Sequence, residues 1–513
     1  MSDGLTPRLG GPRDPRRAAD AAPGCVDLAA YPVPELREEC GVFGAFAVDH
    51  APVLAYYGLY ALQHRGQESA GIAYVTEQGV ESLKGMGLVG EVFDMAEVSC
   101  WRSAAAIGHV RYPTFGSSNY ANAQPLVVQI RQGPLALGHN GQLVNAAVLR
   151  QALEEEGAIF QTDSDSEVIA HLIARAKARD MRAAFAEALP RLSGSYALVA
   201  LTNTALFGAR DPNGIRPLSL GRLNGGWLLA SESCAFDACG AEFVRDIEPG
   251  EMVTITAAGG VESYRFAPAG RPALCSFEYI YFARPDSDIQ GKNVHMVRKE
   301  LGRRLARDFP VDADIVVGVP DSSTSAAIGY AEEAGLPNEI GLIKNRYIAR
   351  TFIQPTQAGR EFAVRLKLNP LRRVVDGQRV VLVDDSIVRG TTSKYIVRLL
   401  RGAGAREVHL RITSPPYRCP CYYGIDTSSS AELIAASHDV EAICRAVGAD
   451  SLAYQTVEGL EAALGYGPDQ TCLACFLGNY VVAAPGRGPE LPALDQRRSV
   501  AFVAGAGEEG RRT

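Results

Sequence analysis

The chain has 513 residues, of which 47% are hydrophobic, and its 51 basic and 58 acidic side chains give a formal net charge of −7. Because this length exceeds what one hydrophobic core usually organises, two domains with tails are expected. The acidic balance and the lack of a long basic block argue against a nucleic-acid partner, and no apolar run reaches the roughly 18 residues of a membrane helix. We therefore expect a soluble protein of the cytoplasm.

Residues 1–39 are rich in Pro, Gly, Ala and charged residues, with no helical or alternating apolar period. This composition predicts a disordered segment. The segment lacks the apolar stretch of a signal peptide, and its acidic residues argue against a transit peptide. We interpret it as a tail or a removable leader.

Residues 40–261 contain short apolar runs separated by glycine-rich turns, with helical stretches near residues 149–156 and 167–178. Many short strands with few helices predict packed antiparallel sheets. Cys40 stands before the first apolar run. If residues 1–39 are removed, the α-amine of Cys40, with an ordinary pKa of about 7.7–8.0, can serve as the general base for its own thiol.

From about Val294 onward the pattern changes to strands followed by helices, as in DIVVGVP before SAAIGYAEEAG and VVLVDD before TTSKYIVRLL. Continuous β-branched runs that alternate with helices predict a parallel sheet covered on both faces. We place this second domain at residues 262–482. Residues 483–513 are again loop-like in composition and are expected to form a poorly ordered tail.

The segment VVLVDDSIVRGTTS, residues 380–393, places two adjacent acids at the carboxyl end of a predicted strand, shortly before a predicted helix. Asp384 and Asp385 can accept hydrogen bonds from two ribose hydroxyls or face a magnesium ion. Backbone N–H groups and hydroxyls at a helix start form a phosphate site. Here they belong to Gly390, Thr391, Thr392 and Ser393. The alternative is that the two acids only cap the helix, but the ordered run favours an activated ribose phosphate.

This segment resembles the phosphoribosyl pyrophosphate signature of type I phosphoribosyltransferases. GVPDSS (residues 318–323) resembles the pyrophosphate loop of that family, and GLIKNRYIARTFIQP (341–355) resembles the flexible loop that closes over the substrate and excludes water. The resemblance implies Mg²⁺ at Ser322, Asp384 and Asp385. It implies phosphoribosyl pyrophosphate binding by Asp384, Asp385, Ser386, Arg389, Gly390, Thr391, Thr392 and Ser393, and by Lys344, Arg346 and Arg350 of the loop. For the three loop residues, the alternative is an ordinary solvated loop.

Several motifs of the first domain occur in the order found in N-terminal-nucleophile glutamine amidotransferases, which they resemble. They are CGVFGAF (40–46), HRGQESAGIA (64–73), GHVRYPTFG (108–116), GHNGQLVN (138–145) and TDSDSEV (162–168). The resemblance implies that Cys40 is the nucleophile, that Arg111 binds the α-carboxylate of glutamine and that Asp165 holds its ammonium group. Asn140 and Gly141 would supply the donors that stabilise the tetrahedral oxyanion.

The eleven cysteines of this chain are not expected to form a disulfide framework. Cys472 and Cys475 form a CxxC motif, whereas Cys275 and Cys421 are isolated in the sequence. Four thiolates can hold zinc or an iron–sulfur cluster. Since zinc ribbons usually use two close CxxC pairs, the iron–sulfur cluster is preferred, with four unrelated buried thiols as the alternative. Cys419 is a rival to Cys421.

The four positions match those of the iron–sulfur subclass of the glutamine phosphoribosylpyrophosphate amidotransferases, which the chain resembles from Cys40 to about Tyr480. In that subclass a ligand directly precedes an aromatic-Tyr-Gly-Ile-Asp run, as Cys421 precedes YYGID. The resemblance implies one [4Fe-4S] cluster per subunit. It also implies an αββα glutaminase domain followed by an α/β type I phosphoribosyltransferase domain. Leaders of this subclass are typically shorter than 39 residues.

This family converts glutamine, phosphoribosyl pyrophosphate and water into 5-phosphoribosylamine, pyrophosphate and glutamate, the first committed step of purine synthesis. A sheltered ammonia route between the domains, feedback inhibition by purine nucleotides and a homotetramer are also implied. One rival is a glucosamine-type amidotransferase, against which residues 380–393 argue. The other is a regulatory protein that binds phosphoribosyl pyrophosphate without chemistry, which would not need Cys40, Arg111 and Asp165 together.

Overall fold

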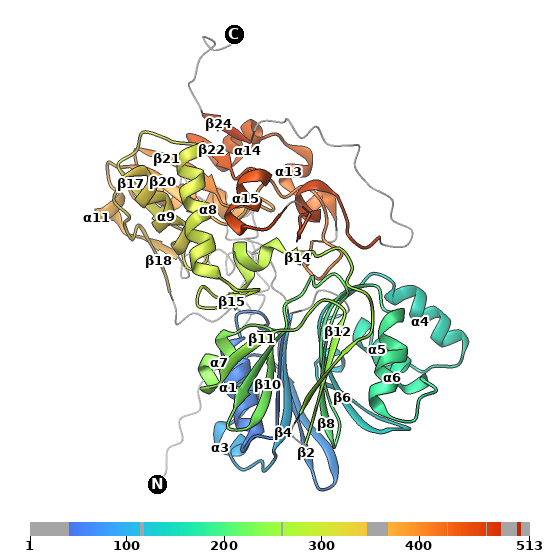
Figure 1. Cartoon of the computed structure of the whole chain (residues 1–513). Coiled ribbons are helices and arrows are strands. Elements are labelled where there is room, and N and C mark those ends of the chain that lie inside the picture. Colours follow the sequence, from blue (N-terminus) through green and yellow to red (C-terminus); the bar gives the residue numbers. More distant parts are fainter. Residues whose placement is uncertain are drawn as a thin grey trace, which may run out of the picture.

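The computed structural model of the chain describes residues 40–112, 117–257, 260–345, 368–427, 429–467, 469–483 and 500–503. Two domains follow one another along the sequence, a strand-rich domain that begins at residue 40 and an α/β domain after it (Figure 1). Among the described helices, none is long and apolar enough to span a membrane. The predicted leader, residues 1–39, lies outside the described residues.

The first domain contains two antiparallel sheets. The first sheet has the spatial order β11 (Glu242–Asp246), β9 (Ser219–Leu223), β10 (Gly226–Ala230), β1 (Gly41–Phe46), β4 (Ala105–Arg111), β2 (Ser69–Thr76) and β3 (Gly79–Met86). The second has the order β13 (Val261–Arg265), β12 (Glu251–Thr256), β8 (Ala205–Arg210), β7 (Gly194–Leu201), β6 (Gly133–Leu143) and β5 (Leu126–Ile130). Strands β1 and β7 are buried along their whole length, which explains their continuously apolar or small residues.

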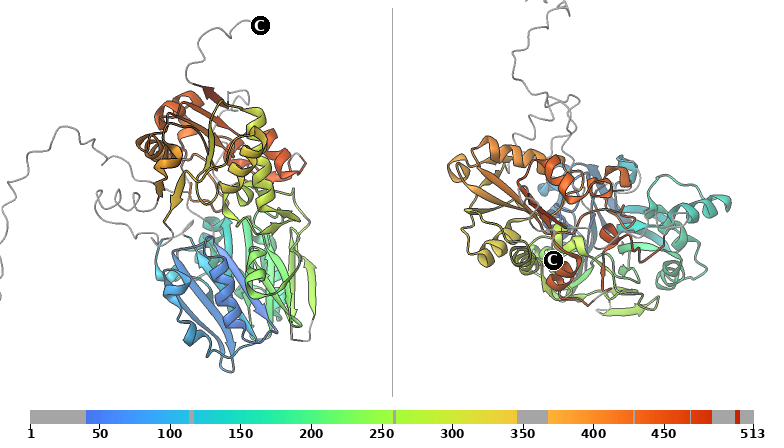
Figure 2. Two further views of the ribbon diagram at one scale, coloured as in Figure 1. Left: turned by 90° about the vertical axis from the view of Figure 1, so that its left-hand side faces the viewer. Right: turned by 90° about the horizontal axis from the view of Figure 1, so that it is seen from above.

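The two sheets pack face to face, and helices cover their outer faces (Figures 1 and 2). The helices over the first sheet are α1 (Ala51–Ala61), α2 (Val89–Val92), α3 (Met95–Val98) and α7 (Cys234–Cys239). Those over the second are α4 (Ala146–Glu155), α5 (Asp165–Arg175) and α6 (Met181–Ala188). Two single turns complete the domain, η2 (Tyr120–Asn122) and η3 (Leu189–Arg191). These four layers confirm the predicted αββα fold, and α4 and α5 coincide with the two predicted helical stretches.

The second domain is built on a sheet with the order β17 (Ile315–Gly318), β20 (Arg379–Asp384), β21 (Glu407–Ile412), β22 (Ser451–Tyr454) and β24 (Ala501–Val503). The first four strands are parallel, as predicted. Alternate residues of β20 serve opposite faces: Val381 and Val383 pack with α8 (Val294–Asp308) and α9 (Thr324–Ala334). Val380 and Leu382 pack with α12 (Thr391–Gly402) and α14 (Val440–Val447) on the other face.

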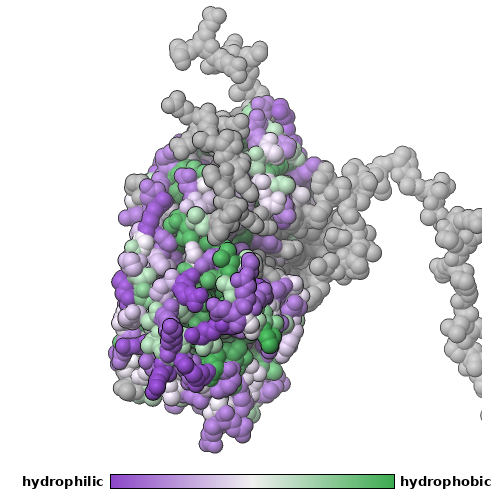
Figure 3. All heavy atoms as spheres, turned by 90° about the vertical axis from the view of Figure 1, so that its right-hand side faces the viewer, coloured by the Kyte–Doolittle hydropathy of each residue, from purple (hydrophilic) through white to green (hydrophobic). Residues whose placement is uncertain are grey.

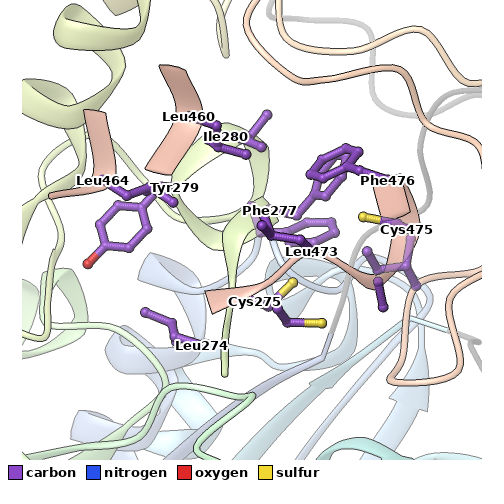
Figure 4. Packing of buried hydrophobic residues seen from close by; sticks show 14 of the residues in the cluster. Leu274, Cys275, Phe277, Tyr279, Ile280, Leu460, Leu464, Leu473, Cys475 and Phe476 are labelled. Atoms are coloured by element: carbon purple, nitrogen blue, oxygen red, sulfur yellow. The ribbon is translucent and has the colours of Figure 1, made fainter. Parts of the chain in front are cut away.

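Short elements complete this domain and join it to the first. Those at the periphery are α11 (Arg372–Val375), α13 (Ile434–Ser437), η5 (Ser430–Glu432) and the paired strands β18 (Leu342–Lys344) and β19 (Leu368–Pro370). Those near the domain junction are β14 (Leu274–Cys275), η4 (Glu278–Phe282), β15 (Asp288–Ile289), β16 (Lys292–Asn293), α15 (Val457–Leu464), β23 (Thr471–Cys472) and α16 (Ala474–Leu477). Their side chains form one apolar cluster, in which Phe277 and Phe476 stack (Figure 4).

Two predicted boundaries need correction. Strand β13 pairs with β12, so the sheet of the first domain continues to Arg265 and the predicted boundary after residue 261 is too early. Residues 483–513 were expected to be a poorly ordered tail, but within them β24 pairs antiparallel with β22. The AFV segment of β24 is short and apolar, and its loop-like flanks hid the strand from a composition argument.

The face of the molecule that carries α4, α5 and α6 mixes hydrophilic and hydrophobic residues, with the hydrophobic ones in small groups (Figure 3). Val148 of α4 and Ile159 after it are exposed examples. Scattered exposed apolar side chains are normal on a protein surface. The predicted site residues lie elsewhere, at the carboxyl edge of the parallel sheet and at the buried end of β1.

Candidate active sites in the two domains

The pairing of strands β1 and β4 places Cys40 opposite Arg111. Cys40 directly precedes β1, and Arg111 is the last residue of the neighbouring strand β4. The antiparallel pair Gly41 and Val110 therefore places the two flanking residues opposite each other. The Cys40 Sγ atom lies 3.6 Å from the carbonyl oxygen of Tyr112, and the thiol is buried.

Arg111 is almost fully buried and carries a carboxylate partner that the sequence analysis did not name. Its Nη1 donates to Glu68 Oε1 at 2.5 Å, and the backbone N–H of Glu68 donates to the Arg111 carbonyl at 3.0 Å. Glu68 belongs to the HRGQES motif, so the motif was visible but the pairing was not. The carboxylate fixes the guanidinium beside Cys40 and compensates its buried charge.

Asn140 and Gly141 lie together in β6 and have the properties of oxyanion donors. The buried Asn140 Nδ2 has no hydrogen-bond partner among the described residues. Gly141 has a φ of 142°, and an added Cβ would lie 2.2 Å from the carbonyl oxygen of Ser195. Since unsatisfied buried donors are rare, the Asn140 amide is available for a ligand oxygen.

Asp165 begins α5, whose N-cap Ser164 accepts a hydrogen bond from Ser166 N. The Asp165 carboxylate is buried, accepts from Leu143 N at 2.9 Å and lies 3.6 Å from Nδ1 of His139. Burial alone raises the pKa of Asp165, but His139 and the Leu143 N–H lower the pKa below its ordinary value overall. Asp165 is therefore an anion beside the thiol, suited to holding an ammonium group.

Burial raises the pKa of the Cys40 thiol to about 11, although the hydrogen bond to Tyr112 and the charge of Arg111 lower it. The thiol is therefore protonated near neutral pH. Nucleophilic attack requires a base that takes this proton during the reaction. Glu68, Arg111 and Asp165 all act electrostatically on the thiol, so two of the predicted glutamine-binding residues, Arg111 and Asp165, lie at one site with Cys40.

In the second domain, Asp384 and Asp385 lie at the carboxyl end of β20, where ligands bind in open parallel sheets. Both carboxylates are buried, and three hydroxyls face them: Ser322 Oγ donates to Asp385 at 2.7 Å, Ser386 Oγ to Asp385 at 2.7 Å and Ser323 Oγ to Asp384 at 3.3 Å. Burial and the neighbouring carboxylate raise the pKa of Asp384 well above its ordinary value, and burial raises that of Asp385.

This arrangement fits a magnesium site. Two adjacent buried carboxylates with raised pKa values gain from a nearby cation, and Mg²⁺ commonly uses one or two carboxylates together with water and phosphate oxygens. Ser322 lies beside them, as predicted. The remaining ligands of such a site would come from substrate and water.

The helix start that was predicted to bind phosphate is formed. Gly390 is the N-cap of α12 with a φ of 78°, and an added Cβ would lie 3.0 Å from Ile434. The buried Thr391 Oγ1 has no hydrogen-bond partner within the described part of the chain. Thr392 and Ser393 follow in the first turn. The positive end of the helix and these hydroxyls form a suitable phosphate cradle.

The basic residues predicted around this site are placed only in part. Lys344 ends β18 and lies 3.3 Å from Asp321 Oδ2 of the 318–323 loop. Arg389 forms an ion pair with Glu432, so its guanidinium is held by that carboxylate and not by the predicted phosphate site. Arg346 and Arg350 lie outside the described residues.

The four predicted cluster cysteines gather at the domain junction. The parallel strands β14 and β23 pair Cys275 directly with Cys472, and Cys475 follows on α16 (Figure 4). The thiol of Cys475 interacts electrostatically with those of Cys275, Cys421 and Cys472. Burial raises the pKa of each of Cys275, Cys472 and Cys475, and the charge of Arg216 opposes this for the first two.

Within the described residues, no group of three or more His, Cys, Asp or Glu side chains is close enough to bind a single metal ion. The four thiols are nevertheless coupled electrostatically, and four cysteine thiolates are the usual ligands of an iron–sulfur cluster. The choice between neighbours also favours Cys421. Its thiol acts on Cys275, Cys472 and Cys475, whereas Cys419 acts on Cys475 and packs near Gly478.

Both domains match known families. The model of a glutamine amidotransferase domain matches residues 111–238, and that of a phosphoribosyl transferase domain matches residues 290–413. The chain is 54% identical over 450 residues to an amidophosphoribosyltransferase of Bacillus subtilis (strain 168), covering 87% of this chain and 94% of that protein. It is 52% identical over 453 residues to the amidophosphoribosyltransferase of Archaeoglobus fulgidus, covering 87% of this chain and 99% of that one.

Solved structures agree with the sequences. The glutamine phosphoribosylpyrophosphate amidotransferase from B. subtilis, complexed with ADP and GMP, superimposes with a TM-score of 0.82 at 53% identity, covering 87% of this chain and 98% of that chain. A structure described as the allosteric regulatory enzyme of purine biosynthesis gives a TM-score of 0.83 at 53% identity, covering 87% and 97%. The similarity therefore extends over both domains and their junction.

Proposed function

The chain belongs to the amidophosphoribosyltransferase family, and from that membership we propose how its own residues divide the reaction between the two domains. The activity is the glutamine-dependent conversion of phosphoribosyl pyrophosphate into 5-phosphoribosylamine, with release of glutamate and pyrophosphate, at the start of purine synthesis. One observation carries the assignment of roles. The register of β1 and β4 sets Cys40 against Arg111, the residue proposed to bind the α-carboxylate of glutamine.

In the glutamine half, Cys40 attacks the carboxamide carbon while Arg111 binds the α-carboxylate and Asp165 binds the α-ammonium group. Asn140 Nδ2 and the backbone N–H of Gly141 stabilise the oxyanion. Because the thiol is protonated at neutral pH, a base must take its proton. The α-amine of Cys40, exposed by removal of residues 1–39, performs this step, and it then returns the proton to the leaving ammonia. Water hydrolyses the resulting thioester to glutamate.

In the phosphoribosyl half, the α12 start at Gly390–Ser393 and Ser386 bind the 5-phosphate, while Asp384 and Asp385 hold the ribose hydroxyls. Lys344, Arg389 and Arg350 add positive charge toward the phosphates. Mg²⁺, held beside Ser322, Asp384 and Asp385, would neutralise charge on the departing pyrophosphate. Ammonia attacks C1 of the ribose from a route sheltered by the domain junction, since ammonia released to water at neutral pH would be protonated.

We further propose that Cys275, Cys421, Cys472 and Cys475 hold one [4Fe-4S] cluster with a structural or oxygen-sensing role, because the overall reaction transfers no electrons. Anaerobically purified protein should be brown. Cys421→Ser should lose bound iron, whereas Cys419→Ser should retain it, as measured by iron content per chain. Equal iron in both variants, or zinc in colourless protein, would overturn the assignment.

The remaining features of the proposal rest on the relatives. Purine nucleotides act as feedback inhibitors, which is supported by the ADP and GMP in the B. subtilis structure. A homotetramer and a cytoplasmic location are expected as in the family. Intact mass and N-terminal sequencing of the purified protein test the leader directly, since a chain that begins at Cys40 is the expected result.

The proposed function is tested by measuring synthesis of 5-phosphoribosylamine from glutamine and from ammonia separately. Cys40→Ala should lower glutamine-dependent synthesis of 5-phosphoribosylamine by about 10⁴-fold or more, because the nucleophile is removed. Synthesis from ammonia should survive, because the second domain is intact. Cys100→Ala, at an exposed cysteine of the same domain, is the matched control and should leave both reactions unchanged. Persistent glutamine use by Cys40→Ala would refute the role of Cys40.

A further inference from the structure

A group of buried ions connects the two domains behind Cys40. Arg65 and Glu232 come from the first domain, and Glu278 comes from the second. Their side chains are all fully shielded from solvent, with Arg65 Nη1 2.6 Å from Glu232 Oε1 and Nη2 2.8 Å from Glu278 Oε1. Buried charges at this depth persist only when well paired, so each member depends on the other domain.

Arg65 holds the backbone of the nucleophile. Its Nε donates to the carbonyl oxygen of Cys40 at 3.1 Å. Its two terminal nitrogens donate to both oxygens of Glu278, at 2.9 and 2.8 Å. A two-pronged pair of this kind fixes the plane of the guanidinium as well as its position. The direction in which Arg65 Nε points at Cys40 is therefore set by a carboxylate of the other domain.

The carboxylate of Glu232 receives hydrogen bonds across the same junction in the opposite direction. It belongs to the first domain and accepts from His64 Nε2 at 2.7 Å, besides Arg65. It also accepts from two groups of the second domain, the backbone N–H of Arg284 at 2.9 Å and Ser287 Oγ at 2.7 Å. Each domain thus supplies groups that complete the hydrogen bonding of the other's buried carboxylate.

The junction between the domains also extends to Gly141, the other proposed oxyanion donor of the glutamine site. Arg216 Nη1 lies 3.5 Å from Glu278 Oε1, and Arg216 Nε donates to the carbonyl of Tyr423 at 3.1 Å. Tyr423 stands two residues after Cys421. The next residue, Gly424, has a φ of 110°, and a Cβ added there would lie 3.5 Å from the carbonyl carbon of Gly141.

Glu278 has a further structural peculiarity, because it begins the π-helix η4. Such helices are rare and are found disproportionately at functional sites. The π-helix starts at Glu278, the residue that accepts two hydrogen bonds from Arg65, and it follows shortly after strand β14, which carries Cys275. Local geometry and the ion pairs therefore single out the same residue.

We propose that Glu278 is a positioning residue for the glutamine reaction, although it belongs to the phosphoribosyltransferase domain. Through Arg65 it fixes the carbonyl of Cys40 and with it the direction of the thiol. The inference rests on the proposed role of Cys40. It predicts that the two domains must be docked for the nucleophile to be aligned, which prevents glutamine from being consumed by a chain whose domains have separated.

A double-mutant cycle on the whole protein tests this. Glu278→Gln, Arg65→Gln and the double variant are compared by kcat and KM for glutamine, and by the rate at which a glutamine-like diazoketone alkylates Cys40. Glu278→Gln should lower kcat and the alkylation rate by about 100-fold, the loss typical of a misplaced reacting group, with KM nearly unchanged. The double variant should be no worse than the poorer single variant, because both remove one coupled interaction.

Synthesis from ammonia is the internal measure of folding and should be unaffected in these variants. Glu332→Gln is the matched control, since Glu332 is a half-exposed carboxylate of the same domain that pairs with Lys299 and Arg303. If Glu278→Gln fails to fold, Ser287→Ala removes a single hydrogen bond to Glu232 and should give a smaller fall in the same alkylation rate.

Multiplicative effects in the double variant, or an equal loss of the ammonia reaction, would overturn the proposal for Glu278. Failure of the underlying function looks different. In that case Cys40 of the unaltered protein would not be alkylated, and glutamine would not compete with the reagent.

Discussion

The two active sites treat charge in opposite ways. In the glutamine site, Arg111 is paired with Glu68, and Asp165 receives a backbone N–H and faces His139. In the phosphoribosyl site, Asp384 and Asp385 stand side by side and receive hydroxyl groups, and the pKa of each is raised. The buried charges of the first site are therefore paired within the protein, whereas the two carboxylates of the second have no cationic side chain among their hydrogen-bond partners in the described part of the chain, which agrees with the proposed Mg²⁺.

This difference bears on how each half would select its substrate. Glutamine carries both charges of an amino acid, so the proposed site can recognise it without a metal, through the cation Arg111, which Glu68 holds in place, and the anion Asp165. Phosphoribosyl pyrophosphate carries many negative charges, so a site with two buried carboxylates would need a cation such as the proposed Mg²⁺ to offset the repulsion.

Asp384→Asn should have the largest effect on both reactions together. Loss of this carboxylate should lower synthesis of 5-phosphoribosylamine about 10³-fold with either glutamine or ammonia, since several kcal/mol of charge stabilisation are removed and each 1.36 kcal/mol is about tenfold. Steady-state rates with both nitrogen sources provide the measurement. Asp312→Asn, a highly exposed carboxylate of the same domain, should change neither rate. A loss confined to the glutamine reaction would break the contrast between the sites.

A smaller and one-sided effect is expected from Asn140→Ala. Removing one oxyanion donor typically lowers kcat by about 100- to 1000-fold, and here only the glutamine reaction should respond. The KM for glutamine should change little, because the amide acts on the oxyanion and not on the ground state. Gln151→Ala, at an exposed amide of α4 that donates to Glu155, is a suitable control. If Asn140→Ala mainly raised KM, the amide would be a binding group instead.

The smallest effect concerns pH and magnesium. The pKa values of Asp384 and Asp385 are raised in the folded chain, so the metal-free folded state keeps protons that the unfolded state has lost. Stability from this pair therefore decreases as pH rises from the ordinary carboxyl pKa toward the raised values. Mg²⁺ competes with these protons, so it should raise the melting temperature more at pH 8 than at pH 5.5, by roughly 2 °C.

Calorimetry with and without Mg²⁺ checks this shift, and Asp384→Asn should abolish its pH dependence. The pair does not act alone, because the buried Arg298 favours the charged form of Asp385. A magnesium effect that was equal at both pH values would mean that the two carboxylates are already ionised in the metal-free protein. The contrast with the glutamine site would then rest on geometry alone.

Much of the fold followed from sequence patterns because both domains obey simple periodicities. The β-branched runs of the second domain predicted its parallel strands, and the carboxyl end of β20 predicted the location of Asp384 and Asp385. Ordered motifs likewise predicted that Arg111 and Asp165 would lie near Cys40, as they do. These three residues lie at strand ends or a helix start, where local sequence determines position, whereas Asn140 lies within β6.

What escaped prediction depends on contacts between distant segments. Glu68 was visible in HRGQES, but its pairing with Arg111 arises only from the register of β2 and β4. Glu278 and Arg65 are 213 residues apart, and neither shows a motif that points to the other. Strand β24 was missed because three apolar residues within a polar, glycine-rich tail form a strand only when an existing edge is there to pair with.

Strand β24 also has a consequence for the behaviour of the protein in concentrated solution. An open edge of a parallel sheet offers a row of unpaired amides and carbonyls to any other chain. Here the AFV segment covers the β22 edge, and on the opposite edge residues 337–339 bond to Val316 of β17. Both edges are thus capped by the chain itself, and shortening the protein before residue 500 would uncover one of them and favour self-association into insoluble material.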